Sequence, residues 1–452
     1  MGRTNVRRCW RAAASALLAA GIVAGPVAAP AFAGESIRED QWHLDAMHAP
    51  EMWKISTGEN VTVAVIDSGF KLDHPDLVGQ FLPGKDFSGS SGGVGSYVKG
   101  HGTQMAGLIA GTGKANGGKG AYGLAPGVKV LPLKIANGDE GSVLESEFVG
   151  QIGQAITYAV EQGAKVISIS QGTNAILVNP EDVKKLNKTL AWARAMGSLV
   201  VASVGNEAQS GNPVEFPGAL PNVVGVGASD RNGTVTAESE RGPQVTLIAP
   251  GMDTIAPCTG STGYCKGHGT SDATALVSAS AALVWSVHPD WTANQVLRVL
   301  INTAGKPHDG SNRNDDAGYG AVRPRIALTS PGDPGPADQS PLPADVASPP
   351  AMPAPAASSS ALPSSVPSFT ESSSDVAVGT PTAQPKAEAS SGSGSALPIV
   401  GGVVAGLLVV AGVVFAVVRR RKAAVPPGGA VAVPPPPLQQ PSVPPEDNPY
   451  AR

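Results

Sequence analysis

Three short segments carry an acid, an imidazole and a hydroxyl where these groups can act together. Asp67 ends the apolar run 63–66, while His101 and Ser271 each follow a glycine-rich turn and precede a helical run. An acid can orient an imidazole, the imidazole can take a hydroxyl proton, and the hydroxyl oxygen can then attack a carbonyl carbon. Each segment alone is weak evidence, because Asp commonly forms turns and Ser commonly caps helices. Their combination predicts nucleophilic catalysis.

Four other residues compete for the roles of imidazole and acid. His268 lies in a second Gly-His-Gly-Thr segment, three residues before the candidate nucleophile, so we expect it to flank the site or face solvent. Asp73, Asp76 and Asp86 lie near the candidate acid, but none of them directly ends a predicted strand. The imidazole and acid named above therefore remain the preferred pair.

The elements that must position these groups follow an alternating pattern. Apolar runs rich in β-branched residues alternate with segments that have a helical pattern. The helical patterns are the apolar spacing at 148–160, the segment 180–197 and the capping-box spacing at 292–295. The apolar runs cover residues 61–66, 128–135, 166–169, 199–204, 223–226 and 245–249. Such runs are typical of parallel strands buried on both faces, and the alternation predicts an α/β sheet covered by helices. Functional groups in such folds gather at the carboxyl ends of the strands.

Composition restricts the classes of protein. The chain has 452 residues, a net charge of −4, 56 Gly and 41 Pro, and 42% hydrophobic residues. It is too apolar to be disordered throughout, it lacks the three-residue glycine period of collagen, and its slight acidity argues against a nucleic-acid partner. We expect one globular body at 34–330, large enough for a substantial core, with an N-terminal extension at 34–60 that packs on it.

The flanking segments predict export and membrane anchoring. Residues 1–33 have the basic start, apolar centre and Ala-Phe-Ala end of a signal peptide. Residues 331–395 form a Pro-, Ala- and Ser-rich linker, and 396–418 an apolar segment long enough for a single transmembrane helix. The basic cluster 419–422 opens a Pro-rich tail, 419–452, which the positive-inside rule places in the cytoplasm. The predicted location is the cell membrane, with the body outside the cytoplasm.

Five segments resemble the landmarks of subtilisin-like serine proteases. They are residues 65–69, 74–77, 100–103, 205–206 and 269–271. The chain order of acid, imidazole and hydroxyl is also that of subtilisin. The resemblance implies a three-layer subtilisin-like fold with a mostly parallel β-sheet flanked by helices. It also implies that Asp67 orients the imidazole, His101 is the general base and then acid, Ser271 is the nucleophile, and Asn206 donates to the oxyanion.

The same resemblance implies how substrate binds. A peptide is expected to add as a strand along Ser170, Gln171 and Gly172, which follow the run 166–169. No cofactor is implied and no metal site is predicted. Acids near Asp76 bind structural calcium in some family members, but without an acidic ligand cluster we expect this residue to stabilise a turn.

The N-terminal extension, the linker and the membrane segment together resemble the mycosins. These are membrane-anchored subtilisin-like proteases associated with type VII secretion in actinobacteria. The resemblance implies protein or peptide substrates and a link to type VII secretion machinery. Asp272 and Ala275 depart from the family pattern, in which an apolar residue follows the nucleophile and a Pro comes a few positions later. They motivate an alternative, a structural or stabilising component of a secretion membrane complex in which proteolysis is dispensable.

The cysteines favour one disulfide. Of the three Cys in the chain, Cys9 lies in the predicted signal peptide, which leaves Cys258 and Cys265. They stand just before the candidate nucleophile in a chain that we expect to be exported. A disulfide is therefore favoured over free thiols, and a metal site lacks further ligands. We expect this disulfide to stiffen the approach to Ser271.

Overall fold

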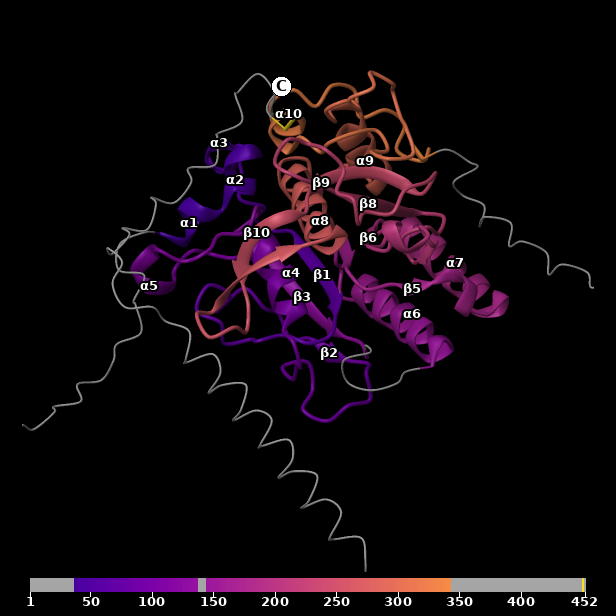
Figure 1. Ribbon diagram of the computed structural model, residues 1–452, viewed down its shortest axis with the longest axis horizontal. Helices are drawn as coiled ribbons and strands as arrows, with labels where there is room; N and C mark the ends of the chain where they lie inside the picture. Colours follow the sequence, from indigo (N-terminus) through magenta and orange to yellow (C-terminus); the bar gives the residue numbers. More distant parts are fainter. Residues whose placement is uncertain (1–35, 137–143, 343–448, 451–452) are drawn as a thin grey trace, which may run out of the picture. The chain divides into compact units, whose positions relative to one another are not determined.

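The computed structural model describes residues 36–136, 144–342 and 449–450 (Figure 1). The predicted signal peptide, the predicted transmembrane helix, most of the predicted linker and nearly all of the tail lie outside the described residues. In the described part of the chain, no helix combines the length and apolarity needed to cross a bilayer.

A seven-stranded sheet forms the centre of the body, and every neighbouring pair of strands is parallel. Its order is β2-β3-β1-β4-β6-β8-β9. The strands are β1 (Thr62–Asp67), β2 (Lys85–Asp86), β3 (Lys129–Lys134), β4 (Val166–Ile169), β6 (Leu199–Ser203), β8 (Val223–Ser229) and β9 (Val245–Pro250). Six of these strands coincide with the predicted apolar runs, which confirms the α/β class with a mostly parallel sheet.

Helices cover both faces of the sheet and complete three layers (Figure 1). In β1, Val63 and Val65 pack in one core with α4 and α8, while Ala64 and Ile66 pack in a second core with α6 and α7. The first core includes the helices α4 (His101–Ala110), α8 (Thr270–Val287), α9 (Ala293–Asn302) and α10 (Pro324–Thr329). Those of the second are α6 (Glu145–Glu161) and α7 (Pro180–Ala195). Burial on both faces explains the β-branched, apolar strands.

Short elements that the apolar pattern did not predict lie around the sheet. They are the helices α1 (Ile37–Asp40), α2 (Trp42–Ala46), α3 (Ala49–Met52) and α5 (Ala115–Gly118), and two antiparallel pairs. These pairs are β5 (Thr173–Asn174) with β7 (Glu215–Phe216), and β10 (Met252–Pro257) with β11 (Tyr264–His268). Contrary to expectation, Asp86 does end a strand, the two-residue β2, because so short and polar an element has no apolar run to mark it. Its carboxylate accepts hydrogen bonds from Ser88 and forms a local turn.

The N-terminal helices pack on the body. Leu44, Met47 and Met52 are fully buried in the core that contains α4 and α8. Trp42 Nε1 lies 3.1 Å from the carbonyl oxygens of Met252 and Asp253 in β10. This segment therefore buttresses the strand pair that precedes Ser271.

The described C-terminal residues also contact the body. Tyr450 is fully buried, and its hydroxyl hydrogen-bonds to that of Ser229 at the end of β8. A Cβ atom built on Gly233 would lie 2.2 Å from Pro449 Cγ, so the Pro449 ring fits against a residue without a side chain.

Candidate active site

The carboxyl end of β1 holds the acid and imidazole predicted from the sequence. Asp67 is fully buried, and His101 Nδ1 lies 2.8 Å from its Oδ1 and 2.9 Å from its Oδ2. The Ser68 backbone N–H also donates to Oδ1, at 2.7 Å. Because a carboxylate only accepts hydrogen bonds, His101 carries its proton on Nδ1, which leaves Nε2 as the basic nitrogen.

Glycines allow these two side chains to meet. Gly100 precedes α4 with φ of 73°, a left-handed conformation that residues with side chains rarely adopt. A Cβ atom built on Gly102 would lie 2.6 Å from the carbonyl oxygen of Gly69 and 3.0 Å from Asp67 Cβ. The start of α4 can therefore approach the end of β1 only with glycine at this position.

Ser271 lies in the first turn of α8, on the same side of the sheet. Its Oγ donates to the carbonyl oxygen of Ser170 at 3.3 Å, and Ser170 Oγ donates to the Ser271 carbonyl at 3.2 Å. The next residue, Gln171, donates from Nε2 to Asp67 Oδ1 at 3.2 Å and lies 3.2 Å from His101 Nδ1. Two consecutive residues after β4 thus contact the start of α8, which carries Ser271, and the acid-imidazole pair.

Asn206 follows β6 and is fixed by the start of α8. Its Oδ1 accepts hydrogen bonds from Thr270 N at 2.8 Å and from Thr270 Oγ1 at 3.0 Å. A Cβ atom built on Gly269 would lie 3.1 Å from that oxygen, so Gly269 leaves room for the amide. Because the oxygen end is held, the Nδ2 group is the end that can donate to a developing negative charge next to Ser271.

Asp272 is buried beside the nucleophile but is bonded away from it. The Thr254 hydroxyl donates to its Oδ2, and Gln104 Nε2 lies 3.3 and 3.4 Å from its two oxygens. Burial raises its pKa to about 6, against the lowering effect of the Thr254 hydrogen bond. These contacts tie the first turn of α8 to β10 and α4. Ala275 is fully buried in the same helix.

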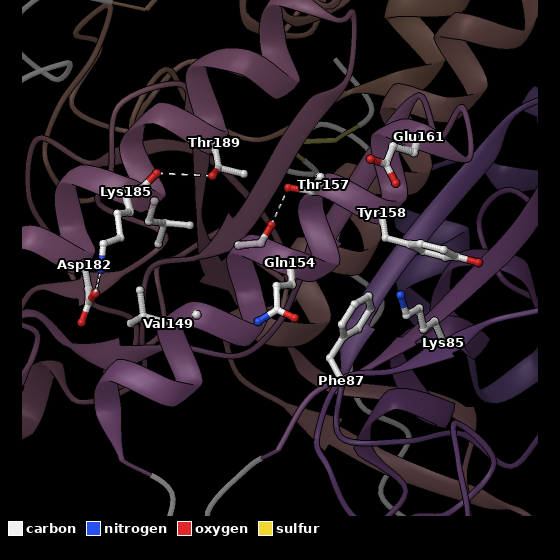
Figure 2. A pocket seen from close by; sticks show the side chains of 13 residues that line it. Lys85, Phe87, Val149, Gln154, Thr157, Tyr158, Glu161, Asp182, Lys185 and Thr189 are labelled. Atoms are coloured by element: carbon white, nitrogen blue, oxygen red, sulfur yellow. Dashed lines mark hydrogen bonds and ion pairs between the residues drawn. The ribbon is translucent and has the colours of Figure 1, made fainter.

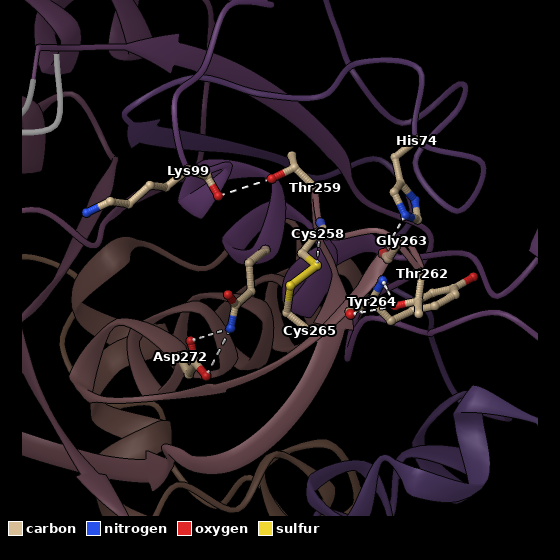
Figure 3. Close-up of a disulfide and its surroundings, with 11 residues drawn as sticks. His74, Lys99, Cys258, Thr259, Thr262, Gly263, Tyr264, Cys265 and Asp272 are labelled. Atoms are coloured by element: carbon tan, nitrogen blue, oxygen red, sulfur yellow. Dashed lines mark hydrogen bonds between the residues drawn. A yellow bond between two sulfur atoms is a disulfide. The ribbon is translucent and has the colours of Figure 1, made fainter. Parts of the chain in front are cut away.

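The predicted disulfide is present. Cys258 and Cys265 are bonded, with their Cα atoms 5.7 Å apart, and link β11 to the residue that follows β10 (Figure 3). Thr259, which follows the first cysteine, donates from Oγ1 to the Lys99 carbonyl at 3.1 Å, just before Gly100 and α4 (Figure 3). The crosslinked strand pair therefore abuts the segment that presents His101.

The competing residues have other partners. Asp76 is fully buried and accepts hydrogen bonds from the backbone of Ala115 and Ala121 and from Tyr264 Oη, so it clamps loops together. No cluster of three or more His, Cys, Asp or Glu side chains suited to a metal occurs among the described residues. His268 is exposed on β11, where its bond to Glu238 raises its pKa.

A separate groove of about 430 Å³ lies on the opposite face of the sheet (Figure 2). It runs between α6 and α7, with Lys85 over the rings of Phe87 and Tyr158 at one end. None of the candidate catalytic residues lines it, so the chemistry lies elsewhere.

Two features of the site were not predicted from the sequence. Gln171 was expected to bind substrate, yet it also contacts Asp67 and His101, which only the path of the chain after β4 could reveal. Three glutamates, Glu207, Glu215 and Glu240, lie near Asn206; the one sequence signal was that Glu207 directly follows it.

Comparison with known proteins identifies a family that matches this chain. Residues 58–322, more than half of the chain, match the Subtilase family, Peptidase_S8. The major intracellular serine protease of Bacillus subtilis is 36% identical over 250 residues, which are 54% of this chain and 74% of that protein.

Solved structures of proteases are also similar to this chain. MycP1 from Mycobacterium smegmatis has a TM-score of 0.58 and 26% identity, covering 66% of this chain and 86% of that one. The MycP3 protease from the type VII (ESX-3) secretion system has a TM-score of 0.56 and 29% identity, covering 64% of this chain and 88% of that one. The matched family segment includes all the segments that meet at the end of the sheet, and the chain therefore belongs to the Subtilase family of serine proteases.

Proposed function

We propose that the chain is a membrane-anchored, extracytoplasmic serine endopeptidase that cleaves peptide bonds through Asp67, His101 and Ser271. The contact of His101 Nδ1 with both oxygens of the buried Asp67 carries this proposal. It favours an imidazole held in one orientation and one tautomer, as a general base requires.

The first step forms an acyl-enzyme. His101 Nε2 takes the proton of Ser271 Oγ as that oxygen bonds to the substrate carbonyl carbon, whose π electrons move to the carbonyl oxygen. Asn206 Nδ2 and the N-terminus of α8 stabilise the resulting oxyanion. The oxyanion then re-forms the carbonyl, the C–N bond breaks, and the leaving amine takes the proton from His101.

The second step releases the product. Water loses a proton to His101 Nε2 and attacks the acyl carbon. Collapse of the second oxyanion breaks the bond to Ser271 Oγ, which regains its proton from His101. Asp67 stays ionised throughout and stabilises the imidazolium that forms twice.

Substrate binding belongs to the segment after β4. We assign Ser170, Gln171 and Gly172 as the edge along which a peptide adds as a strand. Support comes from the contacts of Ser170 with Ser271 and of Gln171 with His101, because a peptide bound there lies against both reacting groups.

A role in type VII protein secretion is supported by similarity to MycP1 and MycP3, since MycP3 is described as a protease of the ESX-3 type VII system. The predicted signal peptide at 1–33, the apolar segment 396–418 and the basic cluster after it support the topology. The catalytic body then lies outside the cytoplasm and the tail 419–452 inside it.

One contact opposes this topology. A tail across a bilayer cannot reach the body of its own molecule, yet Tyr450 hydrogen-bonds to Ser229. The topology therefore requires this contact to be absent in the membrane-inserted protein. An Ala451→Cys variant should react with a membrane-impermeant maleimide only after permeabilisation, while the control Ser340→Cys, on the body side, reacts in intact cells. Labelling of Ala451→Cys in intact cells would place the tail outside the cytoplasm and refute the proposed topology.

One observation that motivated the structural alternative, in which proteolysis is dispensable, is weaker in the folded chain. Asp272 is one of the two departures from the family pattern, and its carboxyl accepts hydrogen bonds from Thr254 and Gln104. Rescue of secretion by Ser271→Ala in a deletion strain would favour the alternative, whereas rescue only by the active form would eliminate it.

Comparing the N-termini of secreted proteins from strains that carry the wild type, Ser271→Ala or Ser278→Ala tests the proposal. Ser278 is a matched control, because it lies in the same helix and its buried hydroxyl has no hydrogen-bond partner among the described residues. We expect new N-termini with the wild type and Ser278→Ala, and their loss with Ser271→Ala. Identical N-termini in all three strains would refute a secreted substrate.

A further inference from the structure

Three glutamates from separate segments of the chain converge behind the candidate oxyanion residue. Glu207 directly follows Asn206, Glu215 lies on β7, and Glu240 lies on the connection from β8 to β9. The backbone N–H of Glu207 donates to Glu240 Oε1 at 3.4 Å. The charge of Glu215 acts on Glu240, and that of Glu207 acts on both. The three carboxylates therefore form one acidic cluster.

Two glycines allow this acidic cluster to lie close to the proposed cleavage site. A Cβ atom built on Gly172, in the proposed substrate edge, would lie 2.7 Å from Glu215 Oε2. A Cβ atom built on Gly205, next to Asn206, would lie 2.4 Å from the Glu240 carboxylate. The absence of side chains at both positions lets Glu215 lie against the substrate edge and Glu240 lie against the backbone next to the oxyanion residue. Gly172 and Asn206 are exposed, so a ligand can approach both of them.

The cluster lacks a cation. In the part of the chain that the structure describes, no Lys, Arg or His forms an ion pair with any of the three glutamates. Glu240 is fully buried, and its Oε2 has no hydrogen-bond partner among the described residues. A buried carboxylate oxygen without a partner is unfavourable, so it points to a ligand that supplies a donor.

A basic side chain suits this acidic cluster better than a metal ion does. The described residues contain no His, Cys, Asp or Glu cluster with the spacing of a metal site. A guanidinium or ammonium group offers several donors and a positive charge, and its carbon stem can reach carboxylates at different depths. A substrate residue whose carbonyl reaches Asn206 from the edge at Gly172 must lie beside Gly205, the neighbour of Asn206 in the chain.

We propose that Glu215 and Glu240, with Glu207 at the rim, form the pocket for the side chain of the residue on the N-terminal side of the cleaved bond, and that this pocket selects Arg or Lys. This inference rests on the proposed protease function and names its substrate class.

Titration of the pocket gives the preference a pH dependence. Burial and the neighbouring glutamates raise the pKa of Glu215 to about 7 and that of Glu240 to about 8. Below these values the carboxyls are protonated and attract a cation only weakly, whereas a bound cation favours their ionised forms. The preference for a basic residue should therefore increase from pH 6 to pH 8.

Matched peptides test the proposal on the full-length protein. Two quenched fluorescent peptides differ only at the residue before the cleaved bond, which is Arg in one and its neutral isostere citrulline in the other. The wild type should cleave the Arg peptide with a kcat/KM about 10- to 100-fold higher, the range expected for hydrogen bonds to a charged group. Glu215→Gln should lose most of this ratio while cleaving the citrulline peptide at a rate close to that of the wild type.

Glu161→Gln is the control, because it removes one exposed carboxylate from α6, on the other face of the sheet. It should leave the ratio unchanged. Active-site titration with a fluorophosphonate gives the folded, reactive fraction of each variant, so a misfolded variant is not mistaken for an altered preference. Equal cleavage of both peptides by the wild type, or an unchanged ratio in Glu215→Gln, would overturn the pocket assignment.

The same experiments distinguish failure of the pocket assignment from failure of the protease proposal. A wild-type protein that reacts with the fluorophosphonate but prefers citrulline refutes only the pocket. A wild-type protein that neither reacts with the probe nor cleaves either peptide refutes the catalytic assignment on which the pocket depends.

Discussion

Replacing Asp67 by Asn changes one atom of the site and should remove most of its activity. In the wild type, both carboxylate oxygens accept from His101 Nδ1, at 2.8 and 2.9 Å. The Asn oxygen can still accept from the Ser68 backbone N–H, which lies 2.7 Å from Oδ1, so the loop should keep its shape. The Asn amide group, however, donates hydrogen bonds and favours the His101 tautomer that is protonated on Nε2. That tautomer cannot take the proton of Ser271.

The expected loss is about 10⁴-fold in kcat, the size typical of a serine-protease triad whose imidazole is held in the wrong tautomer, or about 5.5 kcal/mol of barrier. Initial rates of hydrolysis of a quenched peptide from pH 6 to pH 9 measure it, with circular dichroism to verify folding. Asp73→Asn is the control, since that acid is exposed and pairs only with Lys71 among the described residues. Retention of more than a tenth of the wild-type kcat by Asp67→Asn would refute the role of Asp67.

Three further changes test other parts of the site. Asn206→Ala should lower kcat about 10²- to 10³-fold with little change in KM, because the amide acts on charge that develops in the transition state; steady-state kinetics measures both. Asp272→Asn should raise the free energy of unfolding by about 1–3 kcal/mol at pH 8 but not at pH 4. The pKa of Asp272 is raised to about 6 in the folded protein, so the wild type loses stability as the pH rises from about 4 to above 6 and this carboxyl ionises. Asn does not ionise and avoids this loss. Urea unfolding at both pH values checks this, and an equal effect at both would contradict it. Replacing both Cys258 and Cys265 by Ser should cost about 2–3 kcal/mol of stability, as expected for a short closed loop; a calorimetric scan that matches the wild type would exclude this.

The sheet could be predicted from the sequence because its strands are buried on both faces. Val63 to Ile66 are all apolar, since alternate residues enter different cores, and such a run admits few other interpretations. The two-residue strands β2, β5 and β7 carry no such pattern. The pair β10 and β11 mixes exposed and buried residues, so neither was predictable from apolar runs.

The candidate catalytic residues could be predicted because each stands in a short motif with its own glycines. The glutamate cluster could not, because Glu207, Glu215 and Glu240 come from three separate segments that only the folded chain brings together. The partners of Asp272 were also hidden: Thr254 and Gln104 reach it from β10 and α4, so the sequence suggested a charge near the oxyanion where the structure shows a bonded carboxyl.

Covalent labelling of Ser271 tests the central claim most directly. A fluorophosphonate reacts with a serine hydroxyl only when a base activates it, so it reports the Asp67, His101 and Ser271 arrangement without knowledge of the substrate. We predict that the full-length wild type and Ser278→Ala are labelled, that the adduct maps to Ser271, and that Ser271→Ala and His101→Ala are not labelled. Absence of labelling in the folded wild type, or equal labelling of Ser271→Ala, would contradict the account.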